Sequence, residues 1–269
     1  MSQENRIDQC FERLRESGKS AFVAYIAAGD PTMDRSLEIM QALETAGADI
    51  IELGIPFSDP MADGIVNQMA AHRALEAGGN TKQVLELIRR FRETSETPIV
   101  LFTYLNPVYT YGFSDFHNDA TAAGADGILL LDLPPEEAAI NQELAENSGL
   151  KHIRLIAPTS PAERIPELAK SSEGFIYYVS REGVTGAQTS LAEGISQNVA
   201  AIKAHTDVPI VVGFGISTPE QSAEVASSAD GVVVGSAIVR IVAEYGDTDE
   251  VAAKVVEFVK PLVDGAKSV

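Results

Sequence analysis

Short apolar runs recur along the chain and alternate with longer stretches in which hydrophobic and polar residues follow helical spacing. Such runs, bounded by small residues, are typical of buried parallel strands. The pattern predicts eight strands at 21–26, 50–54, 98–103, 127–132, 152–156, 175–179, 208–213 and 231–236. It predicts intervening helices at 32–45, 81–94, 135–148, 191–204 and 219–227, with flanking helices near 5–16 and 248–263.

Alternating strands and helices favour a parallel sheet covered by helices. Eight such units in 269 residues are typical of closure into a barrel. An open doubly wound sheet is the alternative, but no strand-linked G-x-G-x-x-G motif supports it. The sequence therefore predicts a (β/α)8 TIM barrel with an extra N-terminal helix and extra short helices in the βα loops. Residues 1–269 are expected to form a single domain.

Charge and composition narrow the function. The formal net charge of −19 disfavours binding to nucleic acid or to an anionic membrane surface. No apolar run approaches the roughly 20 residues of a membrane span, and no signal peptide is visible. The single cysteine, Cys10, allows no intramolecular disulfide and favours a reducing compartment, so a cytoplasmic location is expected.

A repeated phrase points to a catalytic carboxylate. Small residues and an aspartate precede a buried strand three times, at 46–54, 123–132 and 228–236. Aligning the aspartates places Glu52, Leu129 and Val233 at equivalent positions, which share one orientation because side chains alternate along a strand. Glu52 is thus expected inside the barrel mouth, where apolar walls raise the pKa of a carboxyl group. A structural ion pair with lysine or arginine is the alternative.

The segment after Glu52, residues 57–64, is rich in turn formers and is typical of functional loops. Asp59 precedes a proline and suits a local capping role. Asp63 is the better catalytic candidate.

Glycine-rich segments follow the last strands, at 183–186, 213–217 and 235–239. Loops after the seventh and eighth strands, with a helix starting there, form the usual phosphate site of these barrels. Backbone amides at a helix start favour negative charge, and Ser236 adds a hydroxyl donor. The pattern predicts an anionic group near Gly215, Gly235 and Ser236.

Four aromatic residues fall at or near strand ends and favour a flat apolar ligand, although core packing explains each one as well: Tyr25, Tyr104, Tyr177 and Phe214. The four histidines show no metal-ligand spacing, so no metal is expected. His72, His117 and His205 lie in helical stretches and are expected at the surface. No lysine lies at the C-terminal end of a strand, which argues against imine chemistry.

These segments resemble the alpha subunit of tryptophan synthase over almost the whole chain, in order. The matching segments are 29–31, 52–64, 103–107, 132–134, 180–186, 213–217 and 235–239. The segment from Glu52 to Gly64 is the most specific. The resemblance implies a lyase of L-tryptophan biosynthesis that cleaves indole-3-glycerol phosphate to indole and glyceraldehyde 3-phosphate by a retro-aldol reaction.

The resemblance also implies roles for individual residues. Glu52 matches the glutamate that protonates indole carbon 3, and Asp63 matches the aspartate that accepts the indole N–H. Thr185 resembles a flap threonine that closes toward Asp63. The implied substrate pocket is Tyr25, Tyr104, Leu129, Tyr177, Thr185, Phe214 and Val233, and the implied phosphate donors are Gly186, Gly215, Gly235 and Ser236. Leu131 is bulkier than the small residue that some family members have at the equivalent position.

The family works with a beta subunit in an alpha2-beta2 heterotetramer, and indole passes between the two active sites. By resemblance, residues 56–63, 106–109 and 133–135 face that partner, which holds the pyridoxal phosphate, so this chain is expected to carry no cofactor. Two other functions remain open from the residues alone. They are a phosphosugar isomerase or epimerase, and an inactive phosphate-binding subunit that activates a partner.

Overall fold

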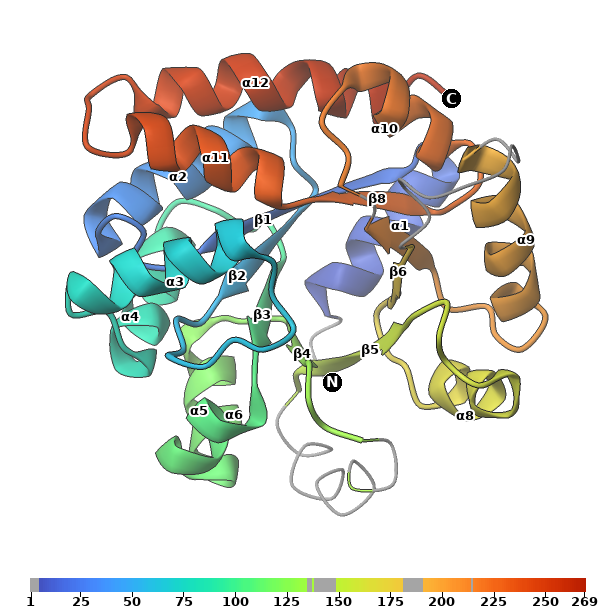
Figure 1. The fold of residues 1–269 in the computed structure, drawn as a ribbon, viewed down its shortest axis with the longest axis horizontal. Helices are drawn as coiled ribbons and strands as arrows, with labels where there is room; N and C mark the ends of the chain where they lie inside the picture. Colours follow the sequence, from blue (N-terminus) through green and yellow to red (C-terminus); the bar gives the residue numbers. More distant parts are fainter. Residues whose placement is uncertain (1–4, 135–136, 138–148, 181–190, 214) are drawn as a thin grey trace.

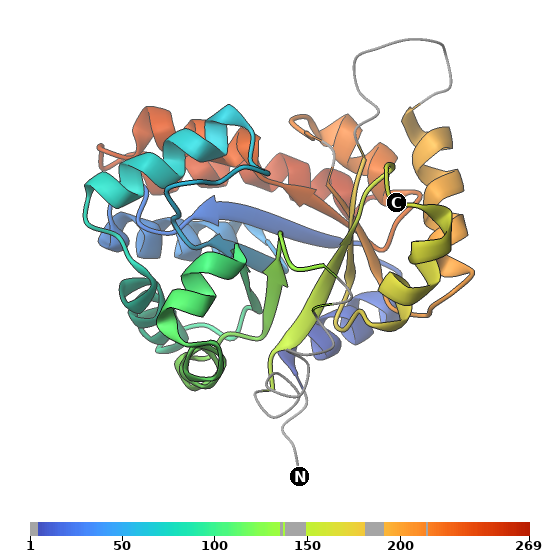
Figure 2. The same ribbon diagram turned by 60° about the horizontal axis from the view of Figure 1, so that its bottom comes forward.

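Eight parallel strands close into a barrel that helices surround (Figure 1, Figure 2). The computed structural model describes residues 5–134, 137, 149–180, 191–213 and 215–269. Neighbouring strands pair in sequence order, and β1 pairs with β8 to close the barrel. The predicted TIM barrel is confirmed.

The strands are β1 (Ala21–Ala27), β2 (Ile50–Gly54), β3 (Ile99–Thr103), β4 (Gly127–Leu130), β5 (Lys151–Ile156), β6 (Ile176–Val179), β7 (Ile210–Gly213) and β8 (Gly231–Val234). The helices are α1 (Arg6–Glu16), α2 (Met33–Ala46), α3 (Ile65–Glu76), α4 (Thr81–Arg92), α5 (Leu105–Tyr111), α6 (Phe113–Ala123), η1 (Ala162–Arg164), α8 (Ile165–Lys170), α9 (Leu191–Lys203), α10 (Pro219–Ala226), α11 (Ser236–Tyr245) and α12 (Val251–Ala266). The helix predicted at 135–148 lies outside the described residues, apart from position 137. The last helix begins and ends three residues later than predicted.

Two apolar layers result from the alternation of side chains along each strand. On β2, Ile51 and Leu53 point outward into the cluster shared with the helices, whereas Ile50 joins the inner cluster. Helix α1 contributes Cys10 and Phe11 to the same inner cluster, so it covers the N-terminal end of the barrel. The interior of the barrel is therefore closed at its N-terminal end, which leaves the C-terminal ends of the strands as its open side.

The aspartates of the repeated phrase stabilise the opposite end of the barrel. Asp49, Asp126 and Asp230 each accept a hydrogen bond from a backbone N–H at the start of a neighbouring strand, at 2.8–2.9 Å. Each aspartate also pairs with a cationic side chain: Lys267 with Asp49, Arg6 and Arg92 with Asp126, and Lys203 with Asp230. The repeat is thus a structural device that joins strand starts to helix ends.

The prediction for His117 is wrong, because this side chain is fully buried. It lies on the face of α6 that also carries the buried Phe116 and Ala120. Its Nδ1 is 2.8 Å from the carbonyl oxygen of Phe113, and its ring stacks on His152 with centroids 5.5 Å apart. Burial lowers the pKa of both rings, that of His152 to about 3. His72 and His205 are exposed, as predicted.

Candidate active site

Glu52 lies on the inner face of β2, paired in register with Tyr25 of β1 and Val100 of β3. Leu129 and Val233 belong to the inner cluster, so the three aligned positions share the orientation expected from the repeat. The Glu52 side chain is fully buried, and neither carboxyl oxygen has a hydrogen-bond partner among the described residues. The alternative of a structural ion pair finds no partner in that part of the chain.

Desolvation alone raises the pKa of Glu52 from its ordinary value of 4.5 to about 8. The charged form of a carboxyl group is disfavoured where water is absent, and no cation offsets this effect. The group is therefore mostly protonated at neutral pH. A carboxylic acid with a pKa near the working pH can both donate and accept a proton.

Asp63 lies in the loop between β2 and α3, and side chains from two elements hold its carboxylate. The Tyr104 hydroxyl donates to Oδ2 at 2.7 Å and accepts the backbone N–H of Ala62 at 3.0 Å. Asn67 Nδ2 approaches Oδ1 at 3.4 Å. Burial raises the pKa of Asp63, and the hydrogen bonds from Tyr104 and Asn67 oppose that rise. Asp59 is exposed.

A cavity of about 430 Å³ opens at the C-terminal ends of the strands. Six residues that were predicted for the site line it: Tyr25, Tyr177, Gly215, Val233, Gly235 and Ser236. A narrower space of about 10 Å³ adjoins Asp63 and Tyr104 and shares Tyr25, Asn67 and Phe102 with the larger cavity. The carboxylate of Asp63 is therefore connected to the same cavity.

Tyr25 and Tyr177 lie close to Glu52. The charge of Glu52 contributes to the raised pKa of both hydroxyls, after burial. Each hydroxyl occupies the space where a Cβ at Gly54 or Gly213 would lie, at 2.6 and 2.7 Å. Glycine at these two strand ends is what admits the tyrosine rings, because any larger residue meets them. Leu129 is fully buried in the inner cluster and does not line the cavity.

Backbone groups of Gly215 and of the start of α11 also face the cavity. Gly215 has a φ of +62°, and a Cβ there would meet nothing within 4 Å, so its backbone faces open space. Gly235 is the N-cap of α11, and no side chain caps that helix. The first amides of α11, beginning at Ser236, have no acceptor within the helix. Thr185, Gly186 and Phe214 lie outside the described residues.

Known proteins match this chain over almost its whole length. The family model of the tryptophan synthase alpha chain matches residues 11–267. A tryptophan synthase alpha chain from Opitutus terrae is 50% identical over 264 residues, covering 98% of this chain and 99% of that one. The chain belongs to the tryptophan synthase alpha chain family. As a member it is an enzyme subunit of tryptophan biosynthesis that cleaves indole-3-glycerol phosphate to indole and glyceraldehyde 3-phosphate.

Solved structures agree with this assignment. The alpha subunit from Legionella pneumophila superposes with a TM-score of 0.91 at 39% identity, covering 98% of this chain and 99% of that one. A structure of tryptophan synthase from M. tuberculosis gives a TM-score of 0.88 at 32% identity, covering 97% and 98%.

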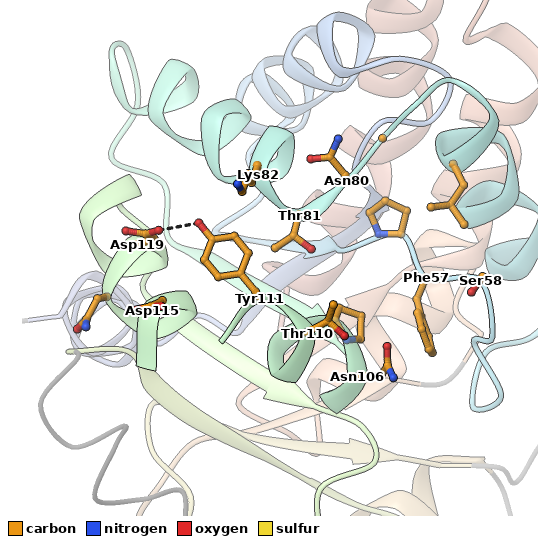
Figure 3. Close-up of a pocket in the computed structure, with 15 residues that line it drawn as sticks. Phe57, Ser58, Asn80, Thr81, Lys82, Asn106, Thr110, Tyr111, Asp115 and Asp119 are labelled. Carbon is orange, nitrogen blue, oxygen red and sulfur yellow. Dashed lines mark hydrogen bonds between the residues drawn. The ribbon is translucent and has the colours of Figure 1, made fainter. Parts of the chain in front are cut away.

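This alpha chain has a second, larger hollow of about 960 Å³ outside the barrel mouth (Figure 3). Phe57 and Ser58 line one side, the start of α4 at Asn80 another, and α5 and α6 the remainder. It contains none of the predicted catalytic or phosphate-binding residues. The largest hollow therefore does not coincide with the predicted site residues, six of which line the smaller cavity.

Two residues of the alpha chain cavity were missed by sequence reasoning. Asn67 lies one helical turn after Asp63, a spacing that places both on one face and could have revealed it. Arg240 lies one turn after Ser236 on α11 and is the only charged residue among the described residues that line the cavity. No cluster of histidine, cysteine or acidic residues that could hold a metal occurs in the described part of the chain.

Proposed function

We propose that Glu52 and Asp63 carry the alpha reaction as an acid and an electrostatic stabiliser. The observation that supports this assignment best is the buried, unpaired carboxyl group of Glu52, whose pKa is raised to about 8. A protonated acid beside an aromatic-walled cavity suits a reaction that needs one carbon of an indole ring to be protonated.

The proposed steps conserve protons. Glu52 donates its proton to carbon 3 of the indole ring, which makes the ring an electron sink. The bond between carbon 3 and the glycerol chain then breaks, and its electron pair returns to the ring. The adjacent glycerol hydroxyl becomes the aldehyde of glyceraldehyde 3-phosphate, and its proton passes to the Glu52 carboxylate. Glu52 ends the cycle protonated.

Asp63 is proposed to accept the indole N–H as positive charge builds on the ring. Its carboxylate is held by the Tyr104 hydroxyl at 2.7 Å, and that hydroxyl is fixed in turn by the Ala62 amide. A negative charge oriented before the reaction stabilises a developing positive charge without reorganisation. Thr185, predicted to close toward Asp63, stays a prediction.

The phosphate is proposed to bind at Gly215, Gly235 and Ser236, together with Gly186. The open backbone at Gly215 and the uncapped start of α11 support this placement. Arg240 adds a full positive charge to the same cavity, which matters in a chain of net charge −19. The remaining predicted pocket residues, Tyr25, Tyr104, Tyr177, Phe214, Val233 and the deeper Leu129, are proposed to surround the indole ring.

We infer that a beta subunit docks over the barrel mouth in an alpha2-beta2 complex. Five large apolar side chains are exposed among the described residues: Met61 at 81%, Ile65 at 69%, Met69 at 47%, Tyr109 at 76% and Val269 at 50%. Three of them, Met61, Ile65 and Met69, lie on the loop that carries Asp63 or on the helix that follows it. Residues 56–63 and 106–109, proposed from the resemblance to face the partner, include two of these. Exposed apolar side chains gathered at one place favour a protein partner.

The pyridoxal phosphate is proposed to belong to that beta subunit, and the alpha reaction as written needs no cofactor. A cytoplasmic location is likewise a proposal. Among the described residues, no helix is long and apolar enough to cross a membrane. The organisation of residues 1–269 as a single domain is also proposed, supported by one closed barrel against which α1 and α12 pack.

The experiment that tests the assignment measures indole release from indole-3-glycerol phosphate, with and without a beta subunit. We expect release by the alpha chain alone and faster release in the complex. A chain that releases no indole under either condition contradicts the proposal. It would instead favour an inactive phosphate-binding subunit.

A further inference from the structure

The mechanism proposed above gives no role to Asn67. It lies in the first turn of α3 and lines both the large cavity and the narrow space beside Asp63. Its amide oxygen is buried and has no hydrogen-bond partner among the described residues. A buried polar atom without a partner costs about 1–3 kcal/mol, and in a native site it calls for an explanation.

The two ends of this amide are distinguishable by their neighbours. The nitrogen faces Asp63 Oδ1 at 3.4 Å, and only the donor end of an amide is compatible with a carboxylate there. Because that nitrogen is a donor, it favours the ionised form of Asp63, opposing the rise that burial causes in the pKa. The oxygen, on the same planar group, is left as an acceptor in the cavity wall.

We propose that Asn67 is a positioning and specificity residue for the alpha reaction. Its amide N–H holds Asp63 ionised and oriented, and its amide oxygen accepts a hydrogen bond from a donor group on the substrate. The donor is an O–H of the glycerol chain, or the indole N–H if Asp63 and Asn67 share it in a three-centre hydrogen bond. This inference rests on the proposed function of the site, and it assigns a residue to which the family resemblance gave no role.

The helix geometry explains why this position can do both. Asn67 lies in the first turn of α3, and Asp63 immediately precedes the N-cap Gly64, so the start of the helix brings these two side chains together. The nearby Gln68 Nε2 donates to the Asp63 carbonyl oxygen at 2.8 Å and fixes the backbone there. Tyr104 holds the other carboxylate oxygen from α5's N-cap position. Both carboxylate oxygens of Asp63 are thus held by a side chain. Of those two side chains, Asn67 is the one with an acceptor atom, its amide oxygen, that has no partner among the described residues.

Two substitutions separate the two halves of the amide. Asn67→Leu has a similar shape and removes both donor and acceptor. Asn67→Asp keeps an acceptor, removes the donor and adds a like charge beside Asp63. We expect Asn67→Leu to lower kcat/KM about tenfold, a typical effect of losing a hydrogen bond to a charged group. We expect Asn67→Asp to move the acidic limb of the pH profile of kcat/KM upward by about one pH unit, because a like charge raises the pKa of Asp63.

Binding is measured in a Glu52→Gln background, where turnover does not consume the ligand. The chain contains no tryptophan, so indole fluorescence reports binding without background from the protein. We expect Asn67→Leu to weaken the binding of indole-3-glycerol phosphate about tenfold. Indole-3-propanol phosphate lacks the chain hydroxyls. If the substitution weakens the binding of this analogue equally, the donor is the ring N–H. If that binding is unaffected, the donor is a hydroxyl.

His72→Leu is the matched control, because His72 lies on the exposed face of the same helix. It should change neither binding nor the pH profile. The thermal midpoint of Asn67→Leu should be unchanged or higher, since an orphaned polar atom is removed from a buried place. Wild-type binding, rate and pH profile in both Asn67 variants would overturn the inference while leaving the proposed function intact. Absence of indole release by the wild type would instead contradict the function itself.

Discussion

Titration of Glu52 makes the stability of the fold depend on pH in a direction that the structure fixes. Its pKa is 4.5 when exposed and about 8 when folded. Between these values the folded chain retains a proton that the unfolded chain has lost. The free energy of unfolding therefore falls as pH rises, by about 1.4 kcal/mol per pH unit, and levels off above about pH 8.

The effect is isolated by comparing the wild type with Glu52→Gln, which does not titrate. Between pH 5.5 and pH 7.5, the stability of the wild type relative to this variant should fall by about 2–3 kcal/mol. Urea unfolding followed by far-UV circular dichroism measures both free energies. The fixed cost of burying a glutamine amide cancels, because it is the same at both pH values.

A pH-independent difference between the two proteins would refute the reasoning, since it requires that Glu52 has the same pKa folded and unfolded. A difference of the opposite sign would indicate a lowered pKa, and hence a cation beside the carboxylate.

Three further predictions follow from the contacts of the site and the barrel end. Tyr104→Phe should lower kcat about tenfold in an indole-release assay, because Asp63 loses a 2.7 Å hydrogen bond, and an unchanged kcat would contradict this role. The wild-type kcat/KM should fall above about pH 8 as Glu52 loses its proton, and a profile flat to pH 10 would exclude it as the acid. Asp126→Ala should destabilise the fold by about 3 kcal/mol in urea unfolding, since Arg92 loses its carboxylate partner and the buried Ile99 N–H loses its acceptor. Asp230→Ala, in a more exposed pair, should cost only about 1 kcal/mol, and equal costs would show that burial does not set the effect.

The fold could be predicted because neighbouring residues alone indicate its elements. Short apolar runs indicate the strands, and small residues indicate where helices end. Most strands are short and largely apolar, and two of the helices that precede them end at a glycine, at Gly47 and Gly124. The position of Glu52 followed from the two-residue period of strands, which needs no tertiary information. The phosphate site stays a prediction, made from glycine at strand ends beside a helix start.

The remaining features depend on contacts between distant segments. The prediction for His117 fails because a polar residue in a helical stretch does not by itself indicate exposure, and the buried Phe116 and Ala120 lie on the same face of α6. The three aspartates of the repeat could be aligned from the sequence. Their hydrogen bonds to backbone N–H groups of neighbouring strands could not be predicted, because those strands are brought together only by folding. The Tyr104 bond to Asp63 joins residues 41 positions apart, and only the folded barrel brings them together.

The most direct test of Glu52 as the proton donor is a single-turnover measurement of indole release by Glu52→Gln, after its binding of indole-3-propanol phosphate has been confirmed. The account predicts binding close to that of the wild type and no detectable indole. Release at the wild-type rate by this variant would contradict it, because an amide cannot supply the proton that carbon 3 requires.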